Sequence, residues 1–506
     1  MWLIKTCLCL SLIKLSTGSI LTKPPQSALI VAFEDIYDFS LLANTLSDQG
    51  IDSTLLIPSK YSKEVYQNLV DVEVIELNCS IDKPLSLNWK ALQACESLLQ
   101  SNELFKRVDE LKPTFTIFPA LRHDACLLPW AKSFDSLPVI YIRNKDEELY
   151  VFHNTGLALP IHHGGFWSGL SAGLGWRSTC SSAKNDYVLP AQELVKKHTV
   201  FPVQVDDLYR DVRLVLWGSD NIIRSDFAQL SQLLVQVGCH HCRGAQPLDG
   251  SLHKPVIEFR SGTVAVLLDQ VYESLVREIA EGLSQGRQGQ AVIWKSKIKN
   301  EEGGELPENL FIREDIDRQD LIGYSRTRVV LSHCGDSELL EAAFHGTPVI
   351  CLARDARESE NGLRVEELRI GQRLEGGRSI SSEEMVQWIK RIEENAEYRE
   401  KARRVSVAIR DSQNPASDRL IYWLGRLART KGEEVDLLAG RKASAAVTLR
   451  EDTDFAKALV YGFALGLAST VACFLLRNVF LSFGRCVGDN SDSSGRSRKL
   501  KGRYES

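Results

Sequence analysis

Residues 329–352 constrain the fold of this chain most strongly, because they encode a strand, a turn, a helix and a second strand in succession. Residues 329–331 (VVL) form a short apolar run of the kind that makes a buried parallel strand, and residues 349–352 (VICL) form another. A helix is predicted over residues 337–344, with Gly346 at the position after a helix end that favours glycine. The turn before this helix opens onto free backbone N–H groups and the positive end of a helix dipole, a combination that suits a phosphate.

Six positions in and after this stretch resemble, in register, the nucleotide-sugar motif of the UDP-glycosyltransferases, the family that includes the UDP-glucuronosyltransferases. They are His333, Gly335, Glu341, Gly346, Pro348 and Asn361. The resemblance implies that His333 and the loop amides contact the diphosphate of a UDP-sugar and that Glu341 holds its ribose hydroxyls.

Several positions depart from the family's motif. Cys334 replaces its second glycine, Ser337 and Glu338 stand where Asn-Ser is usual, and Arg357-Glu358 stand where the family has the Asp-Gln pair that grips the sugar. Glu338 would oppose the diphosphate electrostatically unless it turns outward. Glu358 could still accept bonds from sugar hydroxyls, and Arg357 could pair a glucuronate carboxylate. Ser337, Arg357, Glu358 and Asn361 are therefore predicted to bind the donor.

Two further donor contacts follow from the resemblance. Gly262-Thr263 matches the family's glycine-serine loop, where a small residue lets the backbone approach the nucleotide sugar closely. Arg318 falls where the family has a tryptophan-containing element over the uracil, and its guanidinium could lie on the ring plane instead. Residues 418–432 resemble the segment that wraps back over the N-terminal domain.

The order of apolar runs predicts an α/β chain with the GT-B fold, two doubly wound Rossmann-like domains facing a cleft. The domains are placed at 19–248 for the acceptor and 256–452 for the donor with return helices, joined by a linker at 249–255. Strands are expected at residues 28–33, 53–57, 72–77, 114–118, 139–142, 212–217, 256–259 and 292–295, and a helical pattern runs over 92–111.

The two ends of the chain predict a membrane protein. Residues 1–18 resemble a secretory signal, and the span is placed at 458–483, where residues 458–476 carry no charge. Lys and Arg in the tail, 484–506, place that tail in the cytosol. The expectation is a single-pass type I protein of the endoplasmic reticulum membrane with a lumenal domain, consistent with the sequon at Asn78.

Catalysis by this family uses a histidine in the loop after the first strand as base, and this chain has none there. Asp35 lies nearest the expected place and could act as base if burial raised its pKa; His123-Asp124 is an alternative pair. No metal or cofactor is expected, since a helix end can stabilise the diphosphate. Cys239 and Cys242 form a CxxC pattern without the second ligand pair that a zinc site needs.

Two functions remain open. The first is a membrane-anchored UDP-glycosyltransferase that moves a hexosyl or glucuronosyl group to a hydroxyl of a small lipophilic acceptor, as a monomer or a homo-oligomer. The second is a catalytically degenerate relative that serves as a lumenal binding or partner subunit; an oligosaccharide transferase subunit is a weaker third. The Gly- and aromatic-rich residues 144–176 could be an acceptor loop or a plain surface loop. A net charge of −5 gives no indication of nucleic-acid binding.

Overall fold

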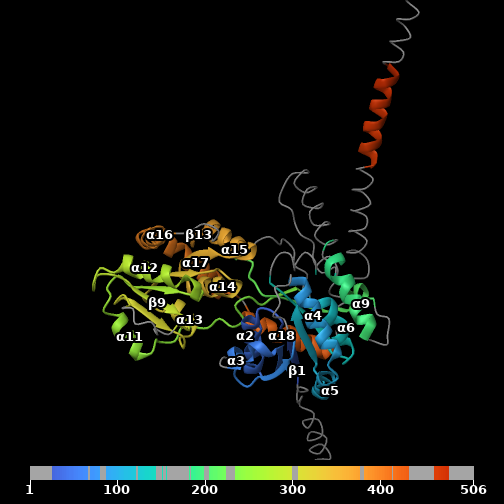
Figure 1. Cartoon of the computed structure of the whole chain (residues 1–506), viewed down its shortest axis with the longest axis horizontal. Helices are drawn as coiled ribbons and strands as arrows, with labels where there is room; N and C mark the ends of the chain where they lie inside the picture. The colour runs from blue at the N-terminus through green and yellow to red at the C-terminus, as the bar shows by residue number, and fades with distance from the viewer. Residues whose placement is uncertain are drawn as a thin grey trace, which may run out of the picture. The chain divides into compact units, whose positions relative to one another are not determined.

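The computed structural model describes residues 26–66, 69–79, 87–120, 123–143, 151, 155, 182, 184–198, 204–223, 234–298, 306–375, 381–412, 414–431 and 461–477. The chain divides into two units, Met1–Ala439 and Gly440–Ser506. The first unit contains two β-sheets with helices packed on both faces (Figure 1). The predicted signal, the sequon residue Ser80, the stretch 144–150 with most of 151–176, and the tail lie outside the described residues.

The N-terminal sheet has seven parallel strands within the described ranges, in the order β3-β2-β1-β4-β5-β6-β7. The chain moves from the centre to one edge and then returns to build the other half, which is the doubly wound topology that the sequence predicted. The strands are β1 Ser27–Val31, β2 Asp52–Pro58, β3 Glu73–Leu77, β4 Phe115–Pro119, β5 Leu137–Ile142, β6 Leu214–Trp217 and β7 Leu234–Gln236. The helices of this part are α2 Ile36–Asp48, η1 Ser59–Tyr61, α3 Ser62–Tyr66, α4 Leu87–Gln100, α5 Asn102–Leu111, α6 Asp124–Lys132, η2 Lys184–Val188, α9 Leu189–His198, α10 Val205–Leu208 and η3 Tyr209–Asp211.

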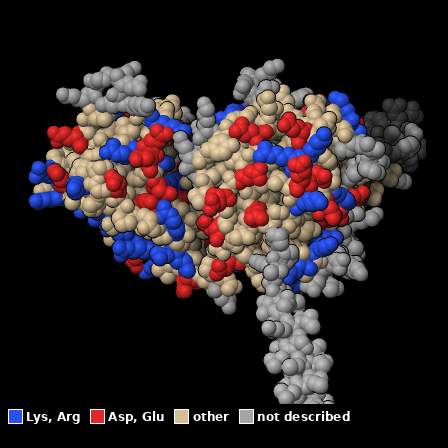
Figure 2. Space-filling view, turned by 90° about the horizontal axis from the view of Figure 1, so that it is seen from below, with Lys and Arg blue, Asp and Glu red and all other residues tan. Residues whose placement is uncertain are grey.

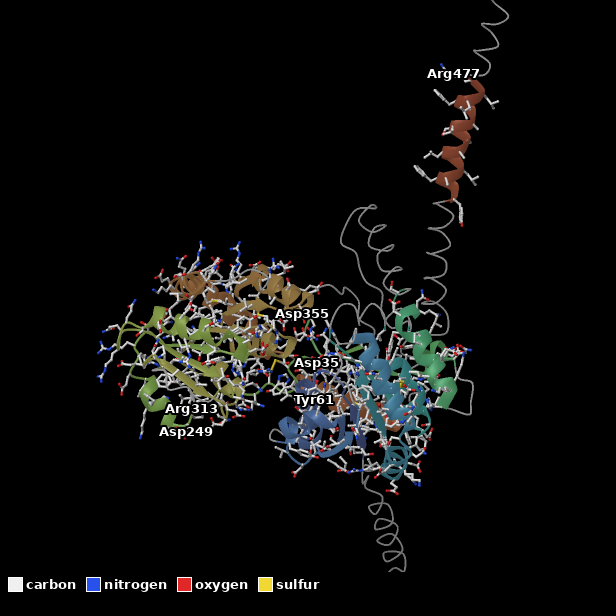
Figure 3. All side chains as sticks on the ribbon, viewed as in Figure 1. Asp35, Tyr61, Asp249, Arg313, Asp355 and Arg477 are labelled. Atoms are coloured by element: carbon white, nitrogen blue, oxygen red, sulfur yellow. A yellow bond between two sulfur atoms is a disulfide. The ribbon has the colours of Figure 1, made fainter. Side chains whose placement is uncertain are left out.

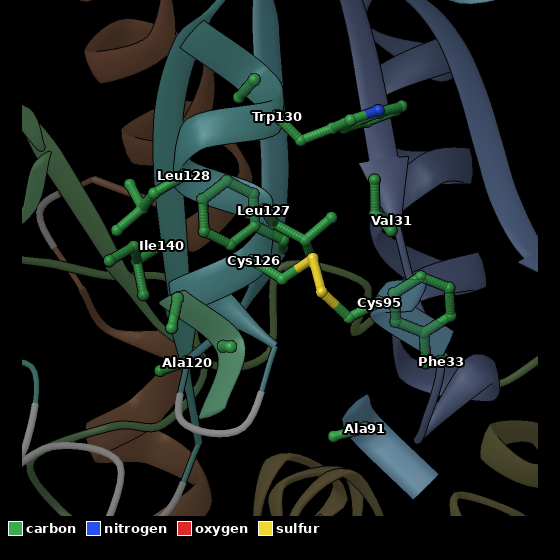
Figure 4. Packing of buried hydrophobic residues seen from close by; sticks show 14 of the residues in the cluster. Val31, Phe33, Ala91, Cys95, Ala120, Cys126, Leu127, Leu128, Trp130 and Ile140 are labelled. Atoms are coloured by element: carbon green, nitrogen blue, oxygen red, sulfur yellow. A yellow bond between two sulfur atoms is a disulfide. The ribbon is translucent and has the colours of Figure 1, made fainter. Parts of the chain in front are cut away.

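Side chains of β1 alternate between two hydrophobic cores. Leu29 and Val31 belong to the core under α4, α5 and α6, whereas Ala28 and Ile30 belong to the core under α2. Because successive strand residues point to opposite faces and helices cover both, residues 28–31 of the strand appear as one apolar run. A disulfide between Cys95 and Cys126 joins α4 to α6 inside the first of these cores (Figure 4).

The C-terminal sheet has six parallel strands among the residues that the structure describes, in the order β10-β9-β8-β11-β12-β13. They are β8 Thr263–Val266, β9 Ala291–Lys295, β10 Leu310–Arg313, β11 Thr327–Ser332, β12 Val349–Ala353 and β13 Gly371–Glu375. The helices are α11 Gly250–Val256, η4 Gln270–Tyr272, α12 Glu273–Leu283, α13 Arg318–Ile322, α14 Asp336–His345, α15 Ala356–Glu367, α16 Ser382–Glu394, α17 Ala396–Arg410 and α18 Ala416–Thr430.

The last of these helices, α18, returns to the N-terminal sheet. Leu420, Leu424 and Leu427 are buried in the same core as β1, β4 and α2. In Figure 1 the orange α18 lies beside the blue α2 rather than with α14–α17. Helix α18, at the end of the C-terminal domain, therefore packs against the N-terminal domain.

The predicted linker at 249–255 coincides with Asp249 and most of helix α11. Asp249 caps the helix by accepting a hydrogen bond from the N–H of Ser251, at 2.9 Å. Leu252 and Val256 are buried in the core of the C-terminal domain. The apolar residues that suggested a strand at 256–259 are thus the end of an amphipathic helix and its following turn.

One helical pattern proved to be two helices. The predicted helix over 92–111 is interrupted at Ser101, whose side chain accepts a hydrogen bond from the N–H of Leu104 at 3.3 Å and starts α5. Near the end of the chain, residues 461–477 are helical. Within the described residues, no helix has the length and hydrophobicity needed to cross a membrane, so the predicted span at 458–483 is not found there.

Candidate functional site

The loop between β11 and α14 is built around His333, which is almost fully buried. Its Nδ1 lies 2.8 Å from the carbonyl oxygen of Leu352, which can only accept, so Nδ1 carries the proton. Its Nε2 then accepts a hydrogen bond from the backbone N–H of Asp269 at 3.2 Å. The imidazole therefore ties together the carboxyl ends of β8, β11 and β12.

Cys334 holds the next position of this loop in a left-handed conformation, with φ of 60°. It is disulfide-bonded to Cys351 on β12, and its N–H donates to Ser332 Oγ at 2.7 Å. Its carbonyl accepts a hydrogen bond from Asn361 Nδ2 at 2.9 Å. Asn361, predicted to bind the donor, thus supports the loop from α15. Gly335 caps α14 with an ordinary φ of −56°.

Carboxyl groups surround the N-terminus of α14. Glu338 accepts a hydrogen bond from Ser332 Oγ at 2.8 Å, and Ser337 donates one to Asp38, which comes from α2 of the other domain. Burial raises the pKa of both Asp38 and Glu338, although Arg318 acts in the opposite direction. Glu338 does not turn outward, and it opposes an anion at this helix end.

Glu341 lies on α14 and is fully buried, and both of its carboxylate oxygens accept hydrogen bonds. Arg318 donates to both carboxylate oxygens at 2.5 and 2.6 Å, and His241 Nε2 lies 2.9 Å from Oε1. Burial by itself would raise the pKa of Glu341, but the charge and hydrogen bonds of Arg318 and His241 lower it to about 2. The guanidinium of Arg318 lies 4.6 Å from the ring centroid of Tyr37 rather than on an open base-binding face.

Arg357 and Asp35 form a contact between the two domains. Arg357 lies 3.5 Å from the carboxylate of Asp35 and 3.9 Å from that of Asp336, and Arg143 also forms an ion pair with Asp35. Figure 3 labels Asp35 where the N-terminal domain meets the C-terminal one. The predicted base is thus engaged by two guanidinium groups in this structure.

The other predicted catalytic and sugar-binding groups also have protein partners. Glu358 is buried and accepts hydrogen bonds from the backbone N–H of Arg354 at 2.7 Å and from its guanidinium. His123, of the alternative pair His123-Asp124, has its Nε2 3.9 Å from Glu34. Cys239 and Cys242 are joined in a disulfide and are not metal ligands.

Gly262 and Thr263, predicted to bind the donor, lie at the amino end of β8, whereas His333 lies at the carboxyl end of β11. Thr263 is the first residue of β8 and pairs with Thr327 and Ala291, which begin β11 and β9. Ligands of open parallel sheets bind at the carboxyl ends of the strands. The loop that corresponds in position follows β8, and a strand prediction beginning at Thr263 could have identified it.

A cavity of about 1060 Å³ opens beside the α14 N-terminus and is bounded by both domains. Of the predicted site residues, Arg318 lines it, together with Glu338. The other walls were missed by the sequence reasoning: Ile36, Tyr37, Ser40, Tyr61 and Val65 from the N-terminal domain, and Leu267, Leu268, Asp269, Gln270, Lys295, Ser296, Lys297, Glu314, Asp315, Ile316 and Asp317 from the C-terminal domain. Most of the latter follow the ends of β8, β9 and β10, which is the signal that could have found them.

Comparisons with known sequences point in one direction. A family model described as "UDP-glucoronosyl and UDP-glucosyl transferase" matches residues 185–490. Human 2-hydroxyacylsphingosine 1-beta-galactosyltransferase is 26% identical over 326 residues, 63% of this chain and 59% of that protein. UDP-glucuronosyltransferase 1A4 of Oryctolagus cuniculus is 22% identical over 319 residues, 61% of this chain and 56% of that protein. The chain thus spans less than two thirds of the length of these relatives.

Solved structures resemble the fold. The calicheamicin glycosyltransferase CalG4 has a TM-score of 0.57 at 18% identity, covering 80% of this chain and 99% of its own. A UDP-glucosyltransferase from Polygonum tinctorium has a TM-score of 0.56 at 15% identity, covering 81% of this chain and 100% of its own. These likenesses, with the two parallel sheets, support the GT-B arrangement of glycosyltransferases. Because the family model covers more than half of the sequence, the chain belongs to the UDP-glucoronosyl and UDP-glucosyl transferase family.

Proposed function

We propose that this protein is a UDP-glycosyltransferase that moves a hexosyl or glucuronosyl group from a UDP-sugar to a hydroxyl of a small lipophilic acceptor. The observation that carries the proposal is the cavity of about 1060 Å³ between the two domains of a member of this family. It lies at the carboxyl ends of β8 and β9, where open α/β sheets bind their ligands, and beside the N-terminus of α14.

The donor would enter from the C-terminal side of this cavity. A diphosphate at the N-terminus of α14 would meet free backbone N–H groups, and no metal is required if these stabilise the leaving group. Glu338 lines the cavity at this helix end, so we expect weaker binding of the donor when its carboxyl group is ionised. Arg357 is the group we propose for a glucuronate carboxylate, once it leaves Asp35.

The acceptor would lie against the N-terminal wall. Ile36, Tyr37, Tyr61 and Val65 give this wall an apolar and aromatic character that suits a lipophilic molecule. The human relative named for transfer of galactose to 2-hydroxyacylsphingosine supports the same class of acceptor.

Proton removal from the acceptor is assigned to Asp35. This role requires Asp35 to separate from Arg357, a contact between domains that a hinge movement can break. General base catalysis contributes about 10²–10⁴-fold to a rate, so an engaged base gives a slow enzyme rather than none.

A lumenal location is proposed as well. Three disulfides in the described residues favour an oxidising compartment such as the endoplasmic reticulum lumen. Membrane anchoring remains a proposal from the uncharged residues 458–476 alone. Protease treatment of sealed microsomes tests the topology: the lumenal domain should be protected, and its digestion would exclude this orientation.

The catalytically degenerate alternative is favoured by one observation, the complete engagement of Glu341 by Arg318 and His241. The two functions are separated by titrating the full-length protein with UDP and by measuring UDP release with UDP-glucose, UDP-galactose and UDP-glucuronate in the presence of lipophilic alcohols. Turnover that falls about 100-fold in Asp35→Asn supports the transferase and its base. UDP binding without turnover of any donor supports the binding subunit, and the absence of both excludes a nucleotide-sugar site.

A further inference from the structure

The contact between Arg318 and Glu341 occupies the position at which the family resemblance places a nucleotide ribose. Arg318 opens α13 and donates through Nε and Nη2 to the two oxygens of Glu341. The Arg318 side chain is 11% exposed and that of Glu341 is not exposed at all. A buried, charge-assisted, bidentate contact is stronger than a hydrogen bond from a neutral hydroxyl, so a ribose cannot simply share Glu341 with Arg318.

The same contact joins parts of the chain that must move apart for a cleft to open. Tyr37, on α2 of the N-terminal domain, lies over the guanidinium of Arg318 at 4.6 Å. His241, between β7 and α11, reaches Glu341 at 2.9 Å from inside the loop closed by the Cys239–Cys242 disulfide. The cluster therefore holds the first domain, the connecting segment and α13 and α14 together.

We infer that Arg318 is an internal latch, a competitor of the nucleotide ribose that keeps Glu341 occupied and the two domains together until a donor displaces it. The inference rests on the proposed function for the identity of the competitor, a UDP-sugar. Its consequence is regulatory: nucleotide affinity and domain opening are coupled, because release of Arg318 from Glu341 also removes its contact with Tyr37.

Replacing Arg318 by Gln in the full-length protein tests the competition. Glu341 then becomes available to ribose hydroxyls, and we expect UDP to bind at least tenfold more tightly than to the wild type in a calorimetric titration. Arg243→Gln is the matched control. Arg243 makes a comparable two-bond pair with Asp320 at 2.6 and 3.1 Å but does not line the cavity, so its loss should change UDP affinity less than twofold. Unchanged or weaker binding of UDP by Arg318→Gln would overturn the latch.

A second measurement does not depend on nucleotide binding. Amide hydrogen exchange in α2 should be faster in Arg318→Gln than in Arg243→Gln without any ligand. If neither the wild type nor Arg318→Gln binds UDP, the proposed function fails, and this difference in exchange alone decides the latch. Equal exchange in the two variants would contradict it. Should Arg318→Gln not fold, Tyr37→Leu, which keeps the ion pair and removes the ring, is expected to show the same faster exchange, and no change there would equally contradict the inference.

Discussion

Cys334, in the loop before α14, is disulfide-bonded to Cys351 on β12, the neighbouring strand of β11. The bond closes a segment that contains the whole of α14, with a sequence separation of 17 residues. The family's motif has a flexible second glycine at the position of Cys334. The disulfide instead places a covalent restraint on the loop that carries His333.

The first prediction concerns this restraint. The double variant Cys334→Ser/Cys351→Ser should lose about 3 kcal/mol of unfolding free energy, since a loop of this length loses roughly that much denatured-state entropy when it is cross-linked. Denaturant unfolding of the oxidised protein measures the change. Cys473→Ser, at an exposed free cysteine, serves as the control. Equal stability of the two variants would mean that the disulfide does not form in the folded protein.

The second prediction is a pH dependence at Glu341. Its pKa of about 2 in the folded protein is below the unfolded value near 4.5, so its stabilisation is complete above about pH 4.5 and disappears as the pH falls towards 2. Glu341→Gln should cost about 3–5 kcal/mol at pH 7, because it leaves Arg318 buried without its partner. The difference from the wild type should narrow as the solution is acidified, and a constant difference would contradict the assignment.

The contribution of Glu338 to stability should depend on pH in the opposite direction. Burial raises its pKa in the folded protein, so it contributes stability below the unfolded value near 4.5 and loses it as the pH rises through the folded pKa. Glu338→Gln is therefore expected to gain stability relative to the wild type between pH 4 and pH 8, and to bind UDP more tightly at pH 8. Chemical unfolding and UDP titration at pH 4 and at pH 8 measure these differences. A loss of stability of Glu338→Gln relative to the wild type as the pH rises would refute the prediction.

A pair of glycine substitutions tests where the donor loop lies. Gly262 has φ of +99°, and a Cβ would lie 2.8 Å from Arg328 Cγ, so Gly262→Ala should destabilise the fold by about 1–3 kcal/mol without a direct effect on UDP affinity. Gly335 has an ordinary φ, and a Cβ would meet nothing closer than 4.0 Å, so Gly335→Ala should fold normally but weaken UDP binding by filling space beside the loop. The reverse pattern of effects would favour the original prediction for Gly262.

The final prediction concerns the returning helix α18. Leu424→Ala should destabilise the protein by about 2–5 kcal/mol, because the side chain is completely buried in the core of the N-terminal domain. Tyr422→Ala, on the same helix with 54% exposure, is the matched control and should change stability by less than about 0.5 kcal/mol. A small effect of Leu424→Ala would mean that α18 does not pack against the N-terminal domain in solution.

The face shown in Figure 2 gives no competing indication of function from its surface charge. On the face shown in Figure 2, acidic and basic side chains are interleaved over most of the described surface. Such interleaving is typical of solvated faces, and it leaves the cavity and its charged walls as the feature that distinguishes this molecule.

Local sequence determined the strands whose two faces are both covered by helices. Residues 28–33 and 329–331 are apolar without interruption because helices pack on both sides of each strand, and that pattern predicts a doubly wound sheet. It failed at residues 256–259, where the apolar run belongs to the end of helix α11 and the turn that follows it. Periodicity cannot separate a helix from a strand over so few positions.

The sequence also placed His333 and Glu341 in one site, because they match the family's motif in register, and the resemblance added Arg318 as a contact for the uracil. Only the tertiary structure decided what they contact. Tyr37, Asp38 and His241 come from segments 100 to 299 residues away from the α14 residues and Arg318 that they meet. Hydrogen bonds and ion pairs between such distant segments depend on how the two sheets and the connecting segment pack, and that packing leaves no local pattern in the chain. The tertiary fold therefore determined whether Glu341 is accessible to a ribose or occupied by Arg318. The charges of Arg318 and Glu341 are the same in both arrangements, so they do not distinguish them.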